Sequence, residues 1–226
     1  MGGHTANWNQ EKCFQIAGGH LAIGPPIHRP KHRINRVLTK RLASHFKDSD
    51  QEMRDLCVLA YGGAFRVKSE PLPATISGPH SKWRFTASDS LHVTLAKRKT
   101  RKDASTVKRR CECSRNPDMC VHTAARRRIR DARARSSERL LTLSYEQAMR
   151  RLKSALTALG IENAEEYGLH SFRRGSAHDL LLAKTPLRDV LAACDWRSSA
   201  FQEYMGREQI DAEALLAAAD ALSDGD

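Results

Sequence analysis

The hydrophobic pattern changes its period once along the chain, and this change constrains the fold more than any other feature. Between residues 82 and 112, apolar and polar residues alternate in three short segments, KWRFTA, LHVTLAK and STVKRRC. Alternation of this kind is typical of half-buried strands. The second segment places Leu91, Val93 and Leu95 on one face. We therefore predict a small three-stranded antiparallel sheet within an otherwise helical chain.

The segments on either side of these strands carry apolar residues at helical spacing. Residues 33–47 and 51–61 show two such patterns, and the paired glycines at 62–63 end the second. Ser144 and Gln147 form a capping box before a helix that Gly160 closes. Residues 122–135 are expected to form a helix or a basic arm. Further helices are predicted over 171–183, from Pro186 to Ala193, over 198–205 and over 212–222. The predicted fold class is α+β, mostly helical.

Positive charge is concentrated in one part of the chain. The formal net charge is +12, with an isoelectric point of about 9.8. Residues 97–135 hold fifteen Lys and Arg against four Asp and Glu, whereas residues 208–226 hold six acids and no Lys or Arg. A chain with this balance most often binds nucleic acid. The alternative is a solvated face or a disordered arm, against which the apolar residues within the run argue.

Several classes of protein are excluded by what the sequence lacks. Six cysteines in 226 residues do not make a dense disulfide framework. No apolar leader opens the chain, and no apolar run is long enough for a membrane span. We therefore expect an intracellular protein, nuclear if its source is eukaryotic, with no membrane partner. Residues 1–30, rich in Gly, His and Pro, are expected to be a flexible lead-in to one domain over 31–226.

Polar residues in the second half of the chain follow a spacing that charge alone does not explain. In LHSFRRG, residues 169–175, His170 and Arg173 are three residues apart and so project from one helix face. Trp196 lies 23 residues beyond Arg173, and Tyr204 lies eight residues beyond Trp196. Upstream, Arg66 follows a predicted buried helix in AYGGAFRVKSE. Each feature is weak by itself, but the ordered combination is specific.

This ordered set resembles the catalytic domain of tyrosine recombinases, the phage-integrase family. The family signature is an Arg, a Lys on a β-hairpin, His-x-x-Arg, a His or Trp, and finally a Tyr. The resemblance covers about residues 35–222 and implies an integrase-like fold. The segments RVKSE, LHSFRRG and DWRSSAFQEYM are most similar to recombinases of eukaryotic DIRS and crypton mobile elements. The resemblance implies catalytic roles for Arg66, Lys99, His170, Arg173, Trp196 and Tyr204.

The lysine of this set has competitors. KRKTRK also contains Lys97 and Lys102. Lys99 is preferred because RKT near the hairpin turn is similar to the Lys-Thr arrangement of the family, and Lys97 is the runner-up. Two further tyrosines, Tyr145 and Tyr167, do not follow a tryptophan at the family spacing. We interpret them as structural.

Two departures from the family pattern concern the first half of the chain. Arg66 precedes Glu70 by four residues, where many members have three, and an ion pair between them is the alternative role for Arg66. The separate N-terminal DNA-clamping domain of the family is not evident, because residues 1–50 are too few to build it.

The resemblance implies transesterification at a DNA phosphodiester, the chemistry of site-specific recombination, DNA integration and transposition. Tyr204 would attack phosphorus and form a 3′-phosphotyrosyl link. A phenol ionises near pH 10, so His170 would accept its proton. Arg66 and Arg173 would neutralise the phosphate, and Lys99 would protonate the leaving 5′-hydroxyl. Because the bond energy stays in the ester, no nucleotide or metal cofactor is expected.

Other interpretations of the chain concern its activity and its partners. A catalytically inactive DNA-binding relic of the same fold is the alternative function, and double-stranded DNA is the expected partner in both cases. In the family, the segment after the tyrosine often packs on a neighbouring protomer. A homo-oligomer on DNA, joined through the C-terminal helix at 211–222, is therefore expected, with packing of this helix on its own domain left open.

The segment CECSRNPDMCVH offers a second possible site. Cys111, Cys113, Cys120 and His122 are the residue types of a Cys₃His zinc site, although their spacing is not the usual one. A zinc-stabilised nucleic-acid module would explain these residues and the charge, but not the His–Arg–Trp–Tyr spacing. Reduced cysteines in a strand-to-helix connection, without metal, are the preferred interpretation.

Overall fold

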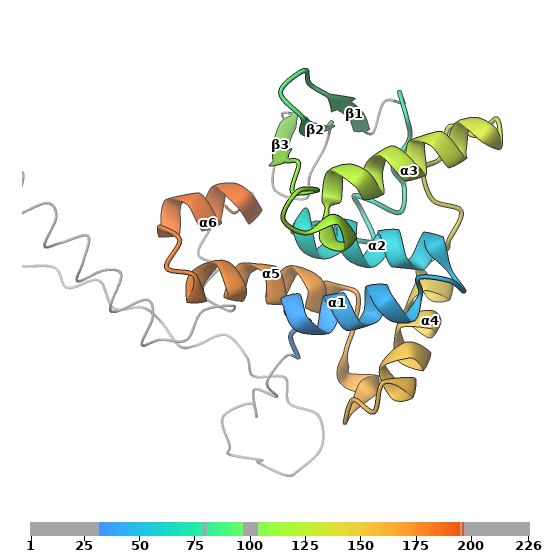
Figure 1. Cartoon of the computed structure of the whole chain (residues 1–226), viewed down its shortest axis with the longest axis vertical. Coiled ribbons are helices and arrows are strands. Elements are labelled where there is room, and N and C mark those ends of the chain that lie inside the picture. Colours follow the sequence, from blue (N-terminus) through green and yellow to red (C-terminus); the bar gives the residue numbers. More distant parts are fainter. Residues whose placement is uncertain (1–31, 79–80, 97–103, 195, 197–226) are drawn as a thin grey trace, which may run out of the picture. The chain divides into compact units, whose positions relative to one another are not determined.

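The computed structural model describes residues 32–78, 81–96, 104–194 and 196. Over these residues the chain forms six α-helices, two short 3-10 helices and three strands (Figure 1). The α-helices are α1 (Arg36–His45), α2 (Gln51–Gly62), α3 (Val121–Ala134), α4 (Tyr145–Ala158), α5 (His170–Leu182) and α6 (Leu187–Cys194). The remaining elements are β1 (Ser81–Phe85), β2 (Ser90–Leu95), β3 (Ser105–Arg110), η1 (Pro117–Met119) and η2 (Ala164–Glu166). The predicted α+β, mostly helical class is confirmed.

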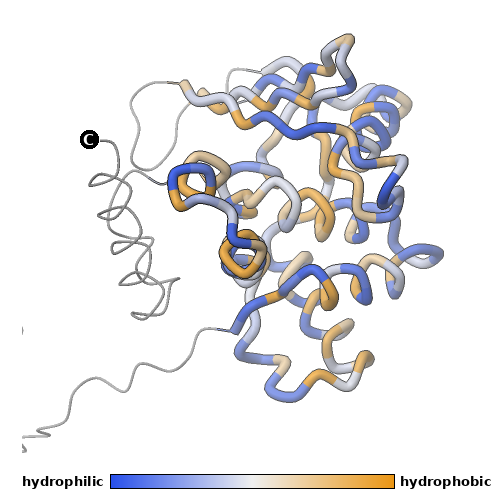
Figure 2. Tube along the Cα trace, turned by 60° about the vertical axis from the view of Figure 1, so that its left-hand side comes forward, coloured by the Kyte–Doolittle hydropathy of each residue, from blue (hydrophilic) through white to orange (hydrophobic). Residues whose placement is uncertain are grey.

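Helix α2 is the central element of this fold, and α1, α3 and α5 pack against it (Figure 1). Every residue from Met53 to Tyr61 is buried, so α2 has no solvent-facing stripe. Its start is capped by Asp50, whose side chain accepts a hydrogen bond from the Met53 N–H at 3.0 Å. Hydrophobic and hydrophilic stretches alternate along the chain in the surrounding helices (Figure 2). In the part of the chain that the structure describes, no helix is long and apolar enough to cross a membrane.

An ion-pair cluster fastens α3 to α2. Asp55 of α2 is fully buried. Arg127 Nε lies 3.0 Å from both of its carboxylate oxygens, and Arg128 Nε lies 2.6 Å from Oδ2. Two positive partners compensate the cost of burying this carboxylate. The same contact raises the pKa of Arg127, because the hydrogen bond to Asp55 outweighs the effect of burial.

The sheet has the strand order β1-β2-β3, and both pairings are antiparallel. Val93 at the centre of β2 pairs with Trp83 of β1 on one side and with Val107 of β3 on the other. Leu91, Val93 and Leu95 are all buried. The predicted three-stranded sheet and the predicted inner face of its second strand are therefore confirmed.

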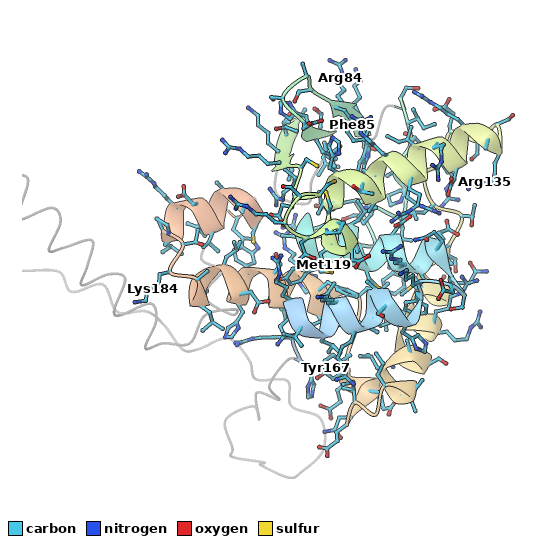
Figure 3. All side chains as sticks on the ribbon, viewed as in Figure 1. Arg84, Phe85, Met119, Arg135, Tyr167 and Lys184 are labelled. Atoms are coloured by element: carbon cyan, nitrogen blue, oxygen red, sulfur yellow. The ribbon has the colours of Figure 1, made fainter. Side chains whose placement is uncertain are left out.

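One face of the sheet packs against α3. Phe85 at the end of β1 lies between the sheet and α3, whereas Arg84 lies at the outer edge (Figure 3). The Phe85 ring centre is 4.7 Å from that of His122, in an edge-on arrangement, and 4.5 Å from the Arg126 guanidinium carbon. The sheet thus covers the first turns of α3 with an aromatic side chain.

The predicted helices between residues 33 and 194 are present, with small shifts at their ends. Helix α1 begins at Arg36, later than the apolar pattern suggested, because the Asn35 side chain accepts the Leu38 N–H at 2.9 Å and caps the helix. Residues 122–135, for which a helix or an arm was expected, form α3. The predicted helices at 198–205 and 212–222 lie outside the described residues.

Helix α4 has the ends that its sequence predicts. The Ser144 side chain accepts the Gln147 N–H at 3.1 Å, and the Gln147 side chain accepts the Ser144 N–H at 2.8 Å. These reciprocal bonds form the capping box. At the other end, Gly160 adopts the left-handed conformation with a φ of 67°, and the Ile161 N–H donates to the Leu156 carbonyl at 3.0 Å. This is the hydrogen bond of a Schellman motif.

Candidate active site

The candidate site is built around the turn that ends α2. Ala64 has a φ of 50°, which is uncommon for a residue other than glycine. Its N–H donates to the Tyr61 carbonyl at 3.0 Å, and the Phe65 N–H donates to the Ala60 carbonyl at 3.1 Å. The two bonds form a Schellman motif with Ala64 in the left-handed position. The glycines at 62–63 do end the helix as predicted, but the turn residue itself is Ala64.

Arg66 is the first predicted site residue after this turn. Its backbone N–H donates to Glu70 Oε2 at 2.8 Å, and its Nη1 lies 3.4 Å from Glu70 Oε1. The Glu70 side chain is 3% exposed and that of Arg66 is 23% exposed. The ion pair expected as the alternative role is therefore present. Glu70 thus contacts both the backbone N–H and the guanidinium of Arg66, while part of the Arg66 side chain remains open to solvent.

A hollow of about 280 Å³ lies beside Arg66. His170, the first residue of α5, lines the same hollow, and so do Lys68 and Ser69 from the loop after α2. Tyr145, the first residue of α4, contributes its ring, whose centre is 5.3 Å from Lys68 Nζ. Arg66 and His170, about a hundred residues apart in sequence, therefore face one basic hollow.

Arg173 of α5 is fully buried, although it carries a charge. Its Nη1 donates to the carbonyl oxygen of Ala64 at 2.6 Å, and its Nη2 donates to the carbonyl oxygen of Cys194. Its guanidinium carbon also lies 5.3 Å from the ring centre of Trp196. A single guanidinium thus connects α5 to the turn after α2 and to the end of α6.

Trp196 belongs to a small apolar cluster separate from the main core. It is 8% exposed and packs with Ala64, Ala177, Val190 and Cys194. Its ring therefore forms an apolar wall beside the guanidinium of Arg173.

The glycine of LHSFRRG allows α5 to approach the chain before α1. A Cβ added at Gly175 would lie 1.8 Å from the carbonyl oxygen of Ile34, which is a hard clash. The Ile34 N–H also donates to the Ser171 carbonyl at 2.9 Å. This close backbone contact fixes the first turns of α5, which carry His170 and Arg173.

The described residues thus bring the predicted site residues together in two pairs. Arg66 and His170 line one hollow, and Arg173 contacts Trp196. The two pairs meet at the Ala64–Arg66 turn, whose first carbonyl is bonded to Arg173. Lys99, its competitors Lys97 and Lys102, and Tyr204 lie outside the described residues, so the structure does not test their predicted positions.

Two residues of the hollow were not assigned to the site from sequence. Lys68 is exposed and lies two residues after Arg66. Tyr145, interpreted as structural, shares the hollow with Arg66 and His170. The segment RVKSE contained the signal for Lys68, but nothing in sequence spacing links Tyr145 to Arg66, because their contact depends on how α4 packs.

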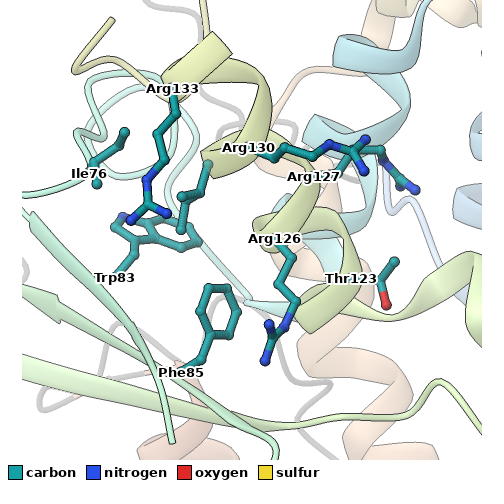
Figure 4. A pocket seen from close by; sticks show the side chains of 9 residues that line it. Ile76, Trp83, Phe85, Thr123, Arg126, Arg127, Arg130 and Arg133 are labelled. Carbon is teal, nitrogen blue, oxygen red and sulfur yellow. The ribbon is translucent and has the colours of Figure 1, made fainter. Parts of the chain in front are cut away.

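A larger hollow of about 560 Å³ lies between the sheet and α3 (Figure 4). Trp83 and Phe85 of β1 form its aromatic wall, and Arg126 and Arg133 extend from α3 toward these rings. We call this hollow the α3 groove. Three of the four arginines that line it, Arg126, Arg130 and Arg133, are exposed. Aromatic and guanidinium groups in one groove can contact bases and phosphates.

Part of the basic segment is not available to a partner. Arg109 of β3 donates to the carbonyl oxygens of Gly62 at 2.8 Å, Gly63 at 3.0 Å and Ala193 at 2.8 Å. These bonds serve carbonyl groups at the ends of α2 and α6 that the helices themselves cannot satisfy. Arg109, like the two arginines on Asp55, therefore contributes to the fold rather than to the surface charge that the sequence count suggests.

Three of the four predicted zinc-ligand candidates come together. The sulfur atoms of Cys111, Cys113 and Cys120 form one group, and the His122 ring packs on Phe85 instead of joining them. Burial acts to raise the pKa of Cys120, but hydrogen bonds from the backbone of Thr123 and Glu112 outweigh it, so that its pKa falls to about 7. Burial also lowers the pKa of His122.

Comparison with known proteins identifies the fold. No protein-family model and no curated protein sequence matches the chain. Among solved structures, it is similar to the XerH site-specific recombinase bound to palindromic difH substrate in a post-cleavage complex, with a TM-score of 0.60 and 12% identity. That match covers 86% of this chain and 54% of XerH. The chain therefore spans about half the length of this recombinase.

Two further structures show the same likeness. The pre-cleavage complex of XerH with difH gives a TM-score of 0.60 at 13% identity, over 81% of this chain and 52% of XerH. XerA recombinase gives 0.57 at 16% identity, over 85% of this chain and 66% of XerA. The predicted integrase-like fold is confirmed by its likeness to the fold of these recombinases. The similarity to DIRS and crypton recombinases stays a prediction.

Proposed function

We propose that this chain cleaves and rejoins double-stranded DNA through a 3′-phosphotyrosyl intermediate, as a tyrosine-type site-specific recombinase. One observation carries the proposal. Arg66 and His170 line one basic hollow, and Arg173 is bonded to the turn that leads into Arg66. The fold of the XerH and XerA recombinases supports the same assignment.

The hollow suits a phosphodiester in size and charge. Arg66, positioned by its ion pair with Glu70, would donate to the non-bridging oxygens, and Lys68 would add a second positive charge. His170 would accept the proton of the attacking tyrosine, for which Tyr204 is proposed. Lys99 is proposed to protonate the leaving 5′-hydroxyl. Loss of Arg66 should slow cleavage about 10²–10³-fold, by analogy with the loss of one oxyanion donor.

Arg173 would act after an exchange of partners. It now donates to the carbonyl oxygens of Ala64 and Cys194. A phosphate oxygen is a stronger acceptor for a guanidinium than a neutral carbonyl. We infer that DNA binding displaces the Cys194 carbonyl, so that the end of α6 and Trp196 move when the site is occupied.

The α3 groove is proposed as a contact surface for DNA outside the hollow. Its exposed arginines, Arg126, Arg130 and Arg133, can neutralise backbone phosphates. Trp83 and Phe85 would provide an apolar wall for sugars or bases. Binding at this surface does not depend on catalysis, so an inactive relic would bind DNA there as well. DNA binding therefore does not distinguish the two functions, and strand cleavage has to be measured directly.

Covalent trapping tests the activity without a known target sequence. The chain is expressed in cells, protein is isolated under denaturing conditions, and the DNA that remains attached is sequenced. We expect covalently attached DNA from the wild type, enriched at a common site, and none from Tyr204→Phe. A nicked duplex of the recovered site should then accumulate the covalent complex in vitro.

Tyr145→Phe is the matched control, because Tyr145 lines the hollow and also carries a phenol. It should keep the covalent product. Loss of the product in Tyr145→Phe but not in Tyr204→Phe would move the nucleophile to Tyr145. Specific DNA binding without any covalent product would favour the inactive relic.

The proposed homo-oligomer has its own test. The segment 208–226 includes the predicted C-terminal helix, which lies outside the described residues. Light scattering over a dilution series, with and without this segment, should show loss of association in the shortened chain. An unchanged mass would assign the segment to its own domain.

A further inference from the structure

Three cysteines converge where β3 leads into α3. Cys111 directly follows β3, Cys113 lies two residues later, and Cys120 is the N-cap residue of α3. The sulfur atoms of Cys111 and Cys113 are 2.9 Å apart, those of Cys113 and Cys120 are 3.3 Å apart, and those of Cys111 and Cys120 are 3.8 Å apart. The connection between strand and helix therefore folds back and brings all three thiols to one point.

These distances are too long for a disulfide and at or below those between the sulfur ligands of a zinc ion. A disulfide requires sulfur atoms about 2.05 Å apart, and all three pairs are well beyond that. A tetrahedral zinc ion with Zn–S bonds of about 2.3 Å places its sulfur ligands about 3.8 Å apart. The largest observed separation already equals this value, at 3.8 Å. The shortest edge of the triangle would have to open by about 1 Å.

Two polar groups beside the start of α3 contact the sulfur atoms. The Glu112 N–H donates to Cys120 Sγ at 3.3 Å, and the Thr123 hydroxyl lies 2.8 Å from Cys113 Sγ. Contacts of this kind orient the ligands of protein-bound metals. Cys120 is buried, while Cys111 and Cys113 are half-buried, so an ion can reach the group from the surface.

We propose that Cys111, Cys113 and Cys120 bind one zinc ion as thiolates, with the fourth position taken by water or another small ligand. Within the described ranges, no His, Asp or Glu atom joins the three sulfur atoms in a group of this size. Thiolates select zinc and softer ions over magnesium or calcium. The thiol protons pass to solvent as the ion binds. The site departs from the expectation of metal-free cysteines and does not depend on strand cleavage.

The ion would join the end of β3 to the start of α3. Next to this point, Arg109 bonds the end of β3 to the carbonyl groups of Gly62, Gly63 and Ala193. The Cys111 N–H also donates to the Asp89 carbonyl in the turn between β1 and β2, at 2.8 Å. A metal here would therefore brace the base of the β2–β3 hairpin against the helices that build the candidate active site.

The first experiment measures metal content and coordination in the full chain. Protein made under reducing conditions with added zinc is analysed by mass spectrometry of its metals, and cobalt is then substituted as a spectroscopic probe. We expect a stoichiometric ion and the intense visible absorption of tetrahedral cobalt with thiolate charge-transfer bands. Both should be lost in Cys111→Ser, Cys113→Ser and Cys120→Ser.

Two control variants make the assignment specific. Cys57→Ala removes a buried thiol of α2 outside the group and should keep the ion. His122→Gln should keep it as well, because His122 packs on Phe85. Loss of the ion in a folded His122→Gln protein would overturn the three-cysteine ligand set.

A stability measurement covers variants that fold poorly. Zinc added to the metal-free wild type at about a hundred times its dissociation constant should raise the melting temperature by about 5–10 °C. The triple serine variant should show no rise. Wild-type protein that binds no more zinc than this variant, or that shows a Cys111–Cys113 disulfide after alkylation under denaturing conditions, would refute the site.

Discussion

Arg173 donates to the carbonyl oxygen of Ala64 at 2.6 Å. The arginine of the His-x-x-Arg motif is therefore bonded to the main chain of the turn before Arg66. Ala64 holds the left-handed position of that turn, with a φ of 50°. Such strained residues persist where their surroundings fix them. Arg173 therefore has a structural role in addition to the phosphate contact that we propose.

Replacement of Arg173 by lysine should separate these two roles. One ammonium cannot reach both carbonyl groups, so the free energy of unfolding should fall by about 2–4 kcal/mol as buried acceptors lose their donors. Urea titration measures this change. His170→Gln, at the half-buried rim of the hollow, is the control and should change stability by less than about 1 kcal/mol. Equal stability of Arg173→Lys and wild type would exclude the structural role.

Gly175→Ala should destabilise the protein through a backbone clash. The new Cβ would meet the Ile34 carbonyl oxygen at 1.8 Å, so α5 would have to move away from the segment before α1. We expect a loss of about 1–3 kcal/mol, as for other overpacked positions. Gly168→Ala is the control, since its Cβ would approach only the end of the Met149 side chain, at 4.0 Å. Similar unfolding midpoints for the two variants would contradict the close approach.

Arg133→Ala should weaken DNA binding in proportion to the loss of one phosphate contact. Arg133 lines the α3 groove and is exposed. The slope of log affinity against log salt for nonspecific duplex DNA should become shallower by about 1. Fluorescence anisotropy over a salt series measures it. Arg150→Ala on α4, also an exposed arginine, serves as the comparison. If both variants change the slope equally, the α3 groove has no special part in binding.

Acid should destabilise the fold partly through His178. Burial lowers the pKa of His178, the nearby Arg33 adds to the effect, and Asp179 opposes it. The unfolded chain then binds a proton near pH 6.5 that the folded chain does not take up until lower pH. Stability contributed by the neutral ring is therefore lost as the pH falls from about 7 to 5.

Replacement of His178 measures this contribution. His178→Gln should show a smaller loss of unfolding free energy over the same pH range. At about pH 8, where histidine is neutral in both states, the pH-dependent difference between the two proteins should vanish. An identical pH profile for wild type and variant would assign the acid sensitivity to other groups.

The elements of this fold were predictable because their signals are local. The period-two pattern around Val93 and the capping box at Ser144 each depend on residues within one element. The pairing of Arg66 with His170 came from a resemblance rather than from physical rules. No local pattern specifies that the segments of Arg66 and His170 lie together. The ordered family motif predicted it.

The details of the site were not predictable, because they involve groups that sequence spacing does not mark. The acceptors of Arg173 are main-chain carbonyl groups, which every residue has. Tyr145 lines the hollow because of how α4 packs. His122 lies apart from the three cysteines, with its ring against Phe85. Long-range packing, not residue type, decides each of these cases.

Arg109 gives the basic segment a meaning that a charge count misses. Its guanidinium reaches three carbonyl groups at the ends of α2 and α6 from a single strand position. A lysine at this position would keep the positive charge and the basic composition typical of proteins that bind nucleic acid. Its single nitrogen, however, could not donate to all three carbonyl groups. Two proteins that carry arginine or lysine at this position would have the same net charge. They would differ in how rigidly the end of β3 is joined to α2 and α6. In this segment the shape of the cation, rather than its charge, is what the fold requires.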